Sequence, residues 1–541
     1  MARATELALA AVGLAALVML PRLASPQFGL LDDGLTLQTA REVHGRWAGV
    51  VYLIPETGRF FPAYWLVYSG IWSAVGVRPL GFFGVNLLLF AGLIAMLTRL
   101  VRLNAGTSLA AGIAAVVFAL SGPAIETFYT LSKAEPLQAT WIGLALLATA
   151  ASARDARWTM ARVGWLLVAT LTALLAHATK ETSVVLIPIA LGWLAFEWRT
   201  RPPHGCRRRF AAAFVAVTAL AALAFFALRW QYAALALGDG SYTRAYSVRL
   251  ATVGPALFRI GAWLVRDFAW LLPVLPAALV LLVRGVGRAP IVYAGIWMLG
   301  WLMVYLPWPA TFAYYLVPFA LGAAVLGGTV VSEAWAVRRG RARPMLITLT
   351  LLWLTAVVNV TADARLQLAV DRANADVVDF LGALPPSSRV VLNMTPVNEY
   401  HFELPMHLRE LKHRPDIVFL RPNSGEAVVA NTFVLTPEMA HQPGPTVRIA
   451  LHEAGVRHDN VTLPSLLPEG GELVYRAAQR IGIVEIGLQR LLCPLGRGPV
   501  FDPTYCPRDR GVVFRGTFVY GWQVHRVVRR GANAATMAHG A

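Results

Sequence analysis

The stretch ALLAHATKETSVVLIPIALGWLAFEW, residues 173–198, places two apolar runs on either side of a short polar segment. His177, Lys180 and Glu181 stand in or beside that segment. Each apolar run belongs to a segment long enough to cross a hydrocarbon core about 30 Å thick. Ionisable residues at the ends of membrane spans are costly, so they tend to face a cavity and to serve a function. The stretch therefore predicts two membrane helices that meet at a functional turn.

The composition of the whole chain agrees with a polytopic membrane protein. Of 541 residues, 57% are hydrophobic and only 14% are charged, and the mean hydropathy is +0.56. A soluble domain of this length is far less apolar. The net charge of +18 lies in short arginine clusters between apolar segments, without the interleaved aromatic residues that bind nucleic acid. We therefore expect a lipid bilayer, and no nucleic acid, as a partner.

Eleven apolar segments, punctuated by Pro, Gly and Arg, are predicted to span the membrane. They are residues 5–21, 80–99, 108–125, 136–152, 161–177, 183–198, 210–228, 267–283, 290–306, 314–332 and 345–361. Basic residues crowd every second loop, which the positive-inside rule assigns to the cytoplasm. Arg3 puts the N-terminus on the same side, so an odd number of spans places the C-terminal part outside. Only Lys133, Lys180 and Lys412 are lysines, a bias typical of a GC-rich bacterial genome, and we expect the inner (plasma) membrane.

The chain is predicted to divide into a transmembrane domain, residues 1–364, and an extracytoplasmic domain, residues 365–530, followed by a disordered tail, 531–541. An outer loop covers residues 22–79. Beyond 365 the pattern alternates between helix and strand, which indicates a small α/β domain. Cys493 and Cys506 could form a disulfide there, because the compartment outside the membrane is oxidising.

Under this topology the ionisable residues of the outer face converge. They are Asp32, Asp33, Glu126, Lys133, Glu135, His177, Lys180 and Glu181. A carboxylate on this face could act as a general base toward an acceptor hydroxyl, and cations beside it could hold the phosphate of a leaving group. Other interpretations stay open: an aspartate that only caps the following helix, lysine pairs that extend to the headgroups, an interfacial histidine and a solvated Glu126.

The order of the motifs resembles the membrane glycosyltransferases of the GT-C superfamily. The resemblance covers about residues 1–335 and is closest to the protein O-mannosyltransferase branch. It is carried by the acidic pair after the first span and by the stretches 59–101, 114–148, 173–198 and 312–324. It implies a GT-C type, all-α membrane domain of about 11 transmembrane helices followed by the small α/β extracytoplasmic domain. It also implies transfer of a sugar, with inversion, from a polyprenyl-phosphate donor to a protein or glycan acceptor outside the membrane.

The resemblance also implies roles for individual residues. Asp32 or Asp33 matches the catalytic base of the first loop. The residues that match donor-phosphate or substrate-binding positions, together with neighbouring candidates, are Arg59, Glu126, Lys133, Glu135, His177, Lys180, Glu181, Tyr314 and Tyr315. Asp32 and Asp33 could also bind a divalent cation, although the sequence shows no further oxygen ligands.

The sequence departs from the mannosyltransferases in two places. RFFPAY, residues 59–64, replaces their His-Pro-Pro element, and their β-trefoil insertion is absent. Both departures leave the acceptor open, and the C-terminal domain is the alternative place to bind it. Two other functions remain as alternatives, namely a transporter or flippase of lipid-linked saccharides and a non-catalytic envelope assembly protein. Transporters usually carry internal repeats and midplane charges, whereas the charges here cluster at one surface.

Overall fold

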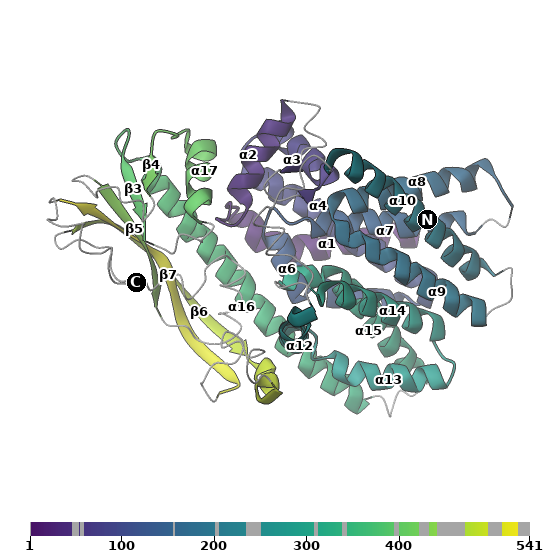
Figure 1. Ribbon diagram of the computed structural model, residues 1–541. Helices are drawn as coiled ribbons and strands as arrows, with labels where there is room; N and C mark the ends of the chain where they lie inside the picture. The colour runs from purple at the N-terminus through teal and green to yellow at the C-terminus, as the bar shows by residue number, and fades with distance from the viewer. Residues whose placement is uncertain are drawn as a thin grey trace.

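The computed structural model describes residues 2–45, 53–54, 59–154, 157–200, 205–233, 250–307, 312–337, 343–393, 400–420, 432–440, 471–495 and 511–528. These residues form a helical bundle and a mixed β-sheet, which the long helix α16 (Arg343–Gly382) connects. Figure 1 shows the sheet at one end of the molecule and the bundle at the other. The predicted disordered tail, 531–541, lies outside the described residues.

The bundle consists of helices whose exposed side chains are apolar. Their bounds are α1 Ala2–Ala24, α4 Pro79–Ala105, α5 Ser108–Ala119, α6 Gly122–Tyr129, α7 Glu135–Ser152, α8 Met160–Thr179, α9 Leu186–Thr200, α10 Cys206–Ala233, α12 Val253–Phe268, α13 Leu271–Val283, α14 Arg288–Tyr305 and α15 Val317–Val337. Leu17, Leu88 and Leu223 are each more than two-thirds exposed. Exposed leucines on helices that satisfy their own backbone hydrogen bonds are what a lipid environment requires.

Six helices in the described part of the chain are long and apolar enough to cross a membrane, and up to eight if two bent pairs each count as one span. One pair is α5 with α6, bent by 56°, and the other joins Leu250–Phe268 to Leu271–Val283 at 88°. The first bend interrupts the predicted span 108–125, because Ser121 Oγ accepts from the Ala124 N–H and starts a new helix. The predicted span 267–283 likewise crosses the second break. The count of eleven spans stays a prediction.

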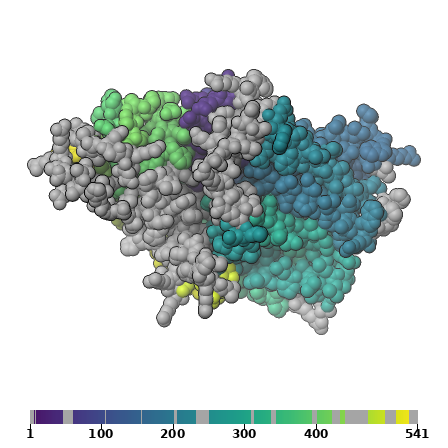
Figure 2. Space-filling model, viewed as in Figure 1, coloured from purple at the N-terminus to yellow at the C-terminus, as the bar shows by residue number. Residues whose placement is uncertain are grey.

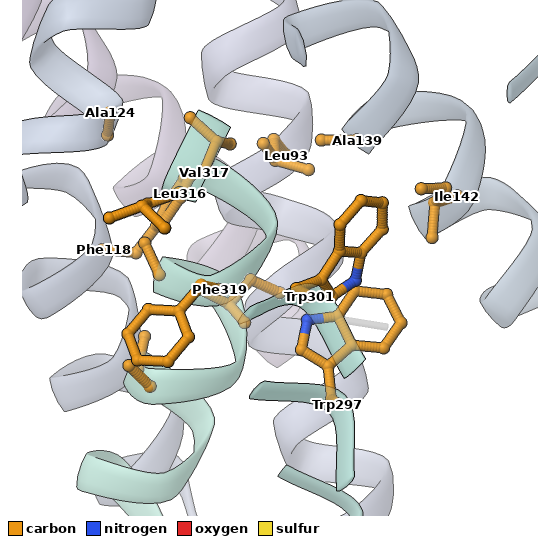
Figure 3. Close-up of a cluster of buried hydrophobic side chains, with 14 of the residues drawn as sticks. Leu93, Phe118, Ala124, Ala139, Ile142, Trp297, Trp301, Leu316, Val317 and Phe319 are labelled. Carbon is orange, nitrogen blue, oxygen red and sulfur yellow. The ribbon is translucent and has the colours of Figure 1, made fainter. Parts of the chain in front are cut away.

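The core of the bundle is dry and aromatic. Figure 3 shows Trp297 and Trp301 of α14 beside Leu316 and Phe319, which lie in and directly after the short helix η4 (Ala313–Leu316). A Cβ on Gly328 would lie 2.3 Å from the carbonyl oxygen of Ala110, so the backbones of α15 and α5 are in direct contact. Small residues permit such close helix packing in membranes. This packing fixes the position of η4 at the end of the bundle.

Short elements cover the end of the bundle that faces the sheet. Helix α2 (Asp33–His44) packs on α3 (Pro62–Val75), and the two-residue strands β1 (Leu53–Ile54) and β2 (Arg59–Phe60) pair antiparallel between them. Two other short helices are η2 (Glu181–Val185) and η3 (Leu250–Thr252). The stretch 22–79, which the sequence predicts as an outer loop, thus contains α2 and α3.

Helix α16 is one continuous helix of 40 residues. At 1.5 Å per residue it is about 60 Å long, roughly twice the thickness of a hydrocarbon core. It contains the predicted span 345–361 and continues into the region beyond 365, where the sequence predicts alternating helix and strand. Residue 364, where the sequence predicts a domain boundary, lies inside this helix, and the division of the chain into domains stays a prediction.

The sheet packs on the C-terminal half of α16. Its strands are β3 Arg389–Leu392, β4 Val418–Leu420, β5 Thr432–Ala440, β6 Gly471–Ile486 and β7 Val513–Val527, in the order β4-β3-β5-β7-β6. Strand β3 is parallel to β4 and β5, and β7 is antiparallel to β5 and β6. Helix α17 (Tyr400–Lys412) connects β3 to β4 on the side of α2. The predicted mixture of helix and strand is therefore present.

The last short helix, η6 (Leu488–Leu495), carries Cys493 between β6 and β7. Cys493 is disulfide-bonded, whereas Cys206 is a free thiol. The predicted partner, Cys506, lies outside the described residues.

Candidate active site

Asp32 is the last residue before α2, and its backbone is left-handed, with φ 65°. Asp32 stands at the N-cap position of α2, but its side chain makes no capping hydrogen bond there. Its carboxylate is 45% exposed, and the Lys133 ammonium lies 3.9 Å from Asp32 Oδ2. A non-glycine residue in this conformation is strained and is often found at functional sites. Asp32 therefore presents an accessible carboxylate beside a cation.

Asp33 is buried, and both of its carboxylate oxygens accept hydrogen bonds. The Gly29 N–H donates to Asp33 Oδ2 at 2.8 Å, and the Ser132 hydroxyl donates to Asp33 Oδ1 at 2.7 Å. Burial raises the pKa of Asp33 to about 7, although these two hydrogen bonds oppose the shift. Asp33 thus joins the loop after α1 to the loop before α7. The two aspartates have different surroundings, and only Asp32 is accessible.

The N-terminus of α2 is capped from the far end of the sequence. Glu403 of α17 accepts from the Gly34 N–H at 2.7 Å through Oε2 and from the Leu35 N–H at 3.2 Å through Oε1. The first N–H groups of a helix lack partners within the helix, and an acidic group there is favourable. In Figure 2 the purple surface of α2 meets the green surface around α17. The sequence analysis missed Glu403, because its pairing with residue 34 is not visible from spacing.

Glycine is required at position 34 by the approach of α17. A Cβ at this position would lie 2.7 Å from His407 Nδ1 and 2.8 Å from Glu403 Oε2. His407 Nδ1 also lies 2.9 Å from the carbonyl oxygen of Glu403, to which it donates. The Asp-Asp-Gly sequence therefore combines an exposed carboxylate, a buried anchor and a position without a side chain.

The two lysines predicted for the site lie over neighbouring tyrosine rings. Lys133 Nζ is 4.5 Å from the ring centre of Tyr314, and Lys180 Nζ is 4.1 Å from that of Tyr315. The Tyr314 and Tyr315 rings are 4.7 Å apart and nearly perpendicular. Lys180 also forms a buried ion pair with Glu135. Helix η4 and the loop before α7 thus bring Lys133, Glu135, Lys180 and both tyrosines together.

Burial lowers the pKa of Lys133, but the carboxylates of Asp32 and Glu135 more than offset this effect and raise it overall. The contributions of Asp33 and Glu126 have the same direction. Lys133 therefore stays protonated in a buried place, which suits it to attract an anion.

Four predicted residues have other surroundings. His177 Nδ1 lies 2.8 Å from the carbonyl oxygen of Ala173 in its own helix, and its ring packs 6.0 Å from Phe225. Glu126 lines a cavity of about 20 Å³ with Asp363 and Gln367. Glu181 begins η2. Arg59 lies in β2, and its side chain is not among the described parts of the structure.

A second pair, which the sequence analysis also missed, lies behind Asp33. Arg22 at the end of α1 forms a 2.6 Å ion pair with Asp371 of α16, and both side chains are buried. Arg22, Asp33, Lys133 and Asp371 line a small polar cavity of about 20 Å³. A space of this size holds about one water molecule. Arg22 and Asp371 thereby fix α16 against the loop that carries the aspartates.

A divalent cation at Asp32 and Asp33 stays a prediction. Asp33 uses both oxygens for hydrogen bonds, and the Lys133 ammonium already faces Asp32. Divalent cations such as Ca²⁺ and Mg²⁺ need several oxygen ligands around one point. Across the described ranges, no three His, Cys, Asp or Glu side chains are grouped to hold a metal.

Solved structures resemble the chain over nearly its full length. ArnT from Cupriavidus metallidurans bound to undecaprenyl phosphate has a TM-score of 0.50 and 15% identity, with 95% of this chain and 97% of ArnT covered. The apo state of the same protein has a TM-score of 0.50 and 16% identity, with 87% and 96% covered. The chain has the GT-C fold. At these identities the likeness shows the fold alone.

The oligosaccharyltransferase of Archaeoglobus fulgidus in its apo form has a TM-score of 0.47 and 12% identity, with 84% of this chain and 72% of that protein covered. No protein-family model and no curated protein sequence matches the chain. Among the sequence-based predictions, the GT-C fold and the membrane-spanning helices are thus confirmed. The roles of the site residues stay predictions within this fold.

Proposed function

We propose that this protein is an integral membrane glycosyltransferase that transfers a sugar from a polyprenyl-phosphate donor to an extracytoplasmic acceptor, with inversion. The observation that carries the proposal is the accessible Asp32 carboxylate 3.9 Å from the buried Lys133 ammonium, on a loop that Asp33 anchors. A GT-C fold and the undecaprenyl phosphate bound to ArnT support a lipid-phosphate donor.

Asp32 is the general base in this proposal. Its carboxylate is half exposed, whereas both oxygens of Asp33 are already occupied. Asp32 accepts the proton of the acceptor hydroxyl while that oxygen forms a bond to the anomeric carbon. The bond from the anomeric carbon to the phosphate oxygen breaks, and its electron pair leaves with the phosphate. Inversion requires that the acceptor attack opposite the leaving group, so Asp32 and Lys133, which lie 3.9 Å apart here, must separate when the sugar lies between them.

Lys133 binds the phosphate that leaves. Its ion pair with Asp32 is long, whereas Lys180 is already neutralised by Glu135. Lys133 therefore stabilises most of the negative charge that develops on the phosphate. Lys180 contributes less, because Glu135 already neutralises it. Tyr314 and Tyr315 hold both ammonium groups in place through cation-π contacts.

An apolar cavity in the bundle has room for only a short part of the donor's prenyl tail. A cavity of about 110 Å³ lies between α4, α7, α9, α14 and α15, with Trp193 and Trp297 in its wall. From Lys180, ring contacts run through Tyr315, Tyr305 and Trp301 to Trp297. This row of packed rings lies between the lysine site and the apolar cavity.

The proposed orientation places the N-terminus in the cytoplasm and the sheet outside a bacterial inner membrane. The disulfide of Cys493 supports this orientation, because disulfides persist in oxidising compartments. Asp32, Lys133 and η4 then lie at the outer surface, where an envelope acceptor is available.

The test uses the full chain in lipid nanodiscs, undecaprenyl-phosphate hexoses and pentoses with labelled sugars, and a bacterial envelope fraction as acceptor. We expect label in the acceptor and free undecaprenyl phosphate. Asp32→Asn should reduce transfer by about 10²- to 10⁴-fold, as for the loss of a general base. Glu42→Gln is the matched control, because Glu42 is an exposed carboxylate on the same helix. In sealed proteoliposomes, movement of intact donor across the bilayer without phosphate release would instead show a flippase and reject the proposal.

A further inference from the structure

A second cavity lies between the bundle and the sheet domain. It has a volume of about 290 Å³, close to the lower limit for small-molecule pockets. Its wall combines the loop after α1, the start of α4, α16 and α17. The residues that matter here are Phe28, Leu30, Val77, Asn374, Val378 and His407. Phe28 and Leu30 of this wall flank Gly29, whose N–H donates to Asp33.

Two residues of this wall have buried polar atoms without a partner among the described residues, Asn374 Nδ2 and His407 Nε2. The orientation of the Asn374 amide is fixed, since Tyr520 and Trp522 both donate to its oxygen, at 3.1 and 3.0 Å. Its nitrogen therefore offers N–H donors. Buried polar groups without partners are rare and call for an explanation.

His407 supplies the complementary group. Because Nδ1 donates to the Glu403 carbonyl oxygen, the neutral ring has an acceptor at Nε2. Burial lowers the pKa of His407 to about 4, against the effect of the Glu403 and Gly29 backbone groups. The ring is thus neutral at physiological pH. Among the uncharged polar groups of this wall, Asn374 offers a donor and His407 an acceptor, and Gln27 adds a second amide.

The charges of the cavity cancel each other. Lys412 and Asp379 form a 2.5 Å ion pair at its exposed rim. The remaining wall is largely apolar, with Phe28, Leu30 and Val378. An anion or a cation would find no uncompensated counter-charge in this wall. A neutral ligand with hydroxyl groups, which both donate and accept, and with C–H faces fits the wall better.

We propose that this cavity binds a sugar ring of the acceptor, with its hydroxyl groups on Asn374 and His407 and its C–H face on the apolar wall. The inference rests on the proposed glycosyltransferase function, and it assigns the site and the substrate class for the acceptor. Phe28 and Leu30 line the cavity and directly flank Gly29, whose N–H holds Asp33. A saccharide here lies on the loop that carries the proposed base.

The experiment measures saturation transfer from the full chain in nanodiscs to a panel of methyl hexosides and pentosides. Val77→Trp fills the cavity without altering its polar groups. Val418→Trp is the matched control, because Val418 is 48% exposed on β4, outside the cavity. Binding of undecaprenyl phosphate is measured in all three chains as a separate reading of the donor site.

We expect at least one glycoside to give saturation-transfer signals with the wild type and with Val418→Trp. These signals should be lost with Val77→Trp. The affinity for undecaprenyl phosphate should agree within twofold among the three chains. Equal glycoside signals in Val77→Trp would overturn the inference, and so would the absence of signals from the wild type. Failure of the proposed function would give a different result. Sugar transfer would then be absent from the wild type and from both variants, whether or not the glycosides bind.

Discussion

The carboxylate of Glu403 accepts hydrogen bonds from the backbone N–H groups of Gly34 and Leu35, 369 and 368 residues away in sequence. A residue of the C-terminal part thereby completes the helix that begins at the candidate active-site aspartates. The part of the chain that forms α17 and the sheet thus supports the candidate active site.

Glu403→Gln should lower both stability and transfer. An amide offers one acceptor and turns an N–H₂ group toward the second donor, so one buried backbone N–H loses its partner. Such a loss costs about 1–3 kcal/mol, and the displaced loop should reduce transfer by about 10- to 100-fold. Thermal unfolding in detergent and labelled-sugar transfer measure the two effects. Glu472→Gln, which removes a half-exposed ion pair with Arg526, should change stability by less than about 1 kcal/mol.

Gly34→Ala should disturb the same junction sterically. The added Cβ would lie within 2.8 Å of Glu403 Oε2, and such overpacking costs about 1–3 kcal/mol. Gly84→Ala in α4 is the matched control, because nothing lies within 4 Å of its Cβ position. Alanine there should leave the unfolding temperature equal or slightly higher, since it favours the helix. Equal unfolding temperatures for the two variants would contradict the tight α2–α17 contact.

Asp33 should make stability depend on pH. The pKa is about 7 in the folded chain against an ordinary value of 3.8, so the folded state holds the proton more tightly. The stability from Asp33 is fully present below about pH 4 and is lost as the pH rises through about 7. The groups that face Asp33 are Ser132, Gly29, Asp371 and Lys133.

Asp33→Asn removes this dependence and weakens one of the two hydrogen bonds. The variant should therefore unfold below the wild type, by a margin that is largest at pH 4–5 and shrinks toward pH 7. Unfolding temperatures of both chains across this range test the sign. A margin that widens with pH would show that Asp33 is ionised in the folded state. Asp32→Asn, at a half-exposed position, should leave the unfolding temperature nearly unchanged at every pH.

The sequence could predict the membrane helices and the lysine group for a physical reason. Apolar length and arginine placement report the environment of each helix directly, and they put Lys133 and Lys180 on one face before any contact is known. Lys180 and Glu135 then meet in the structure. The hydropathy pattern could not show the breaks inside 108–125 and 267–283, because Ser121 caps a helix within an apolar run.

The long-range partners were invisible for a different reason. Glu403 and Asp371 each pair with a group more than 300 residues away, and no local period encodes such a pairing. His177 was a candidate because it lies at the end of a span, and the structure adds that its Nδ1 bonds within its own helix, which no spacing could show. The burial of the His177 ring follows from the packing of the helices and cannot be predicted from the sequence around it.

The two lysines should separate stability from lipid binding. Lys180→Gln leaves Glu135 buried without its cation, which costs about 3–5 kcal/mol, and Lys180→Gln with Glu135→Gln should recover most of that loss. Lys133→Gln leaves only the half-exposed Asp32 unpaired, so its stability should change less. Its affinity for undecaprenyl phosphate should fall by about 10- to 100-fold, the value of a hydrogen bond to a charged group.

Binding of labelled undecaprenyl phosphate and thermal unfolding, measured on the same nanodisc samples, decide between the two roles. Arg526→Gln at the exposed end of β7 is the control for the loss of one positive charge and should bind the lipid as the wild type does. If Lys133→Gln also binds like the wild type while Lys180→Gln with Glu135→Gln does not, the phosphate lies against Lys180. The assignment of the leaving group to Lys133 would then be wrong, and with it the direction from which the acceptor approaches Asp32.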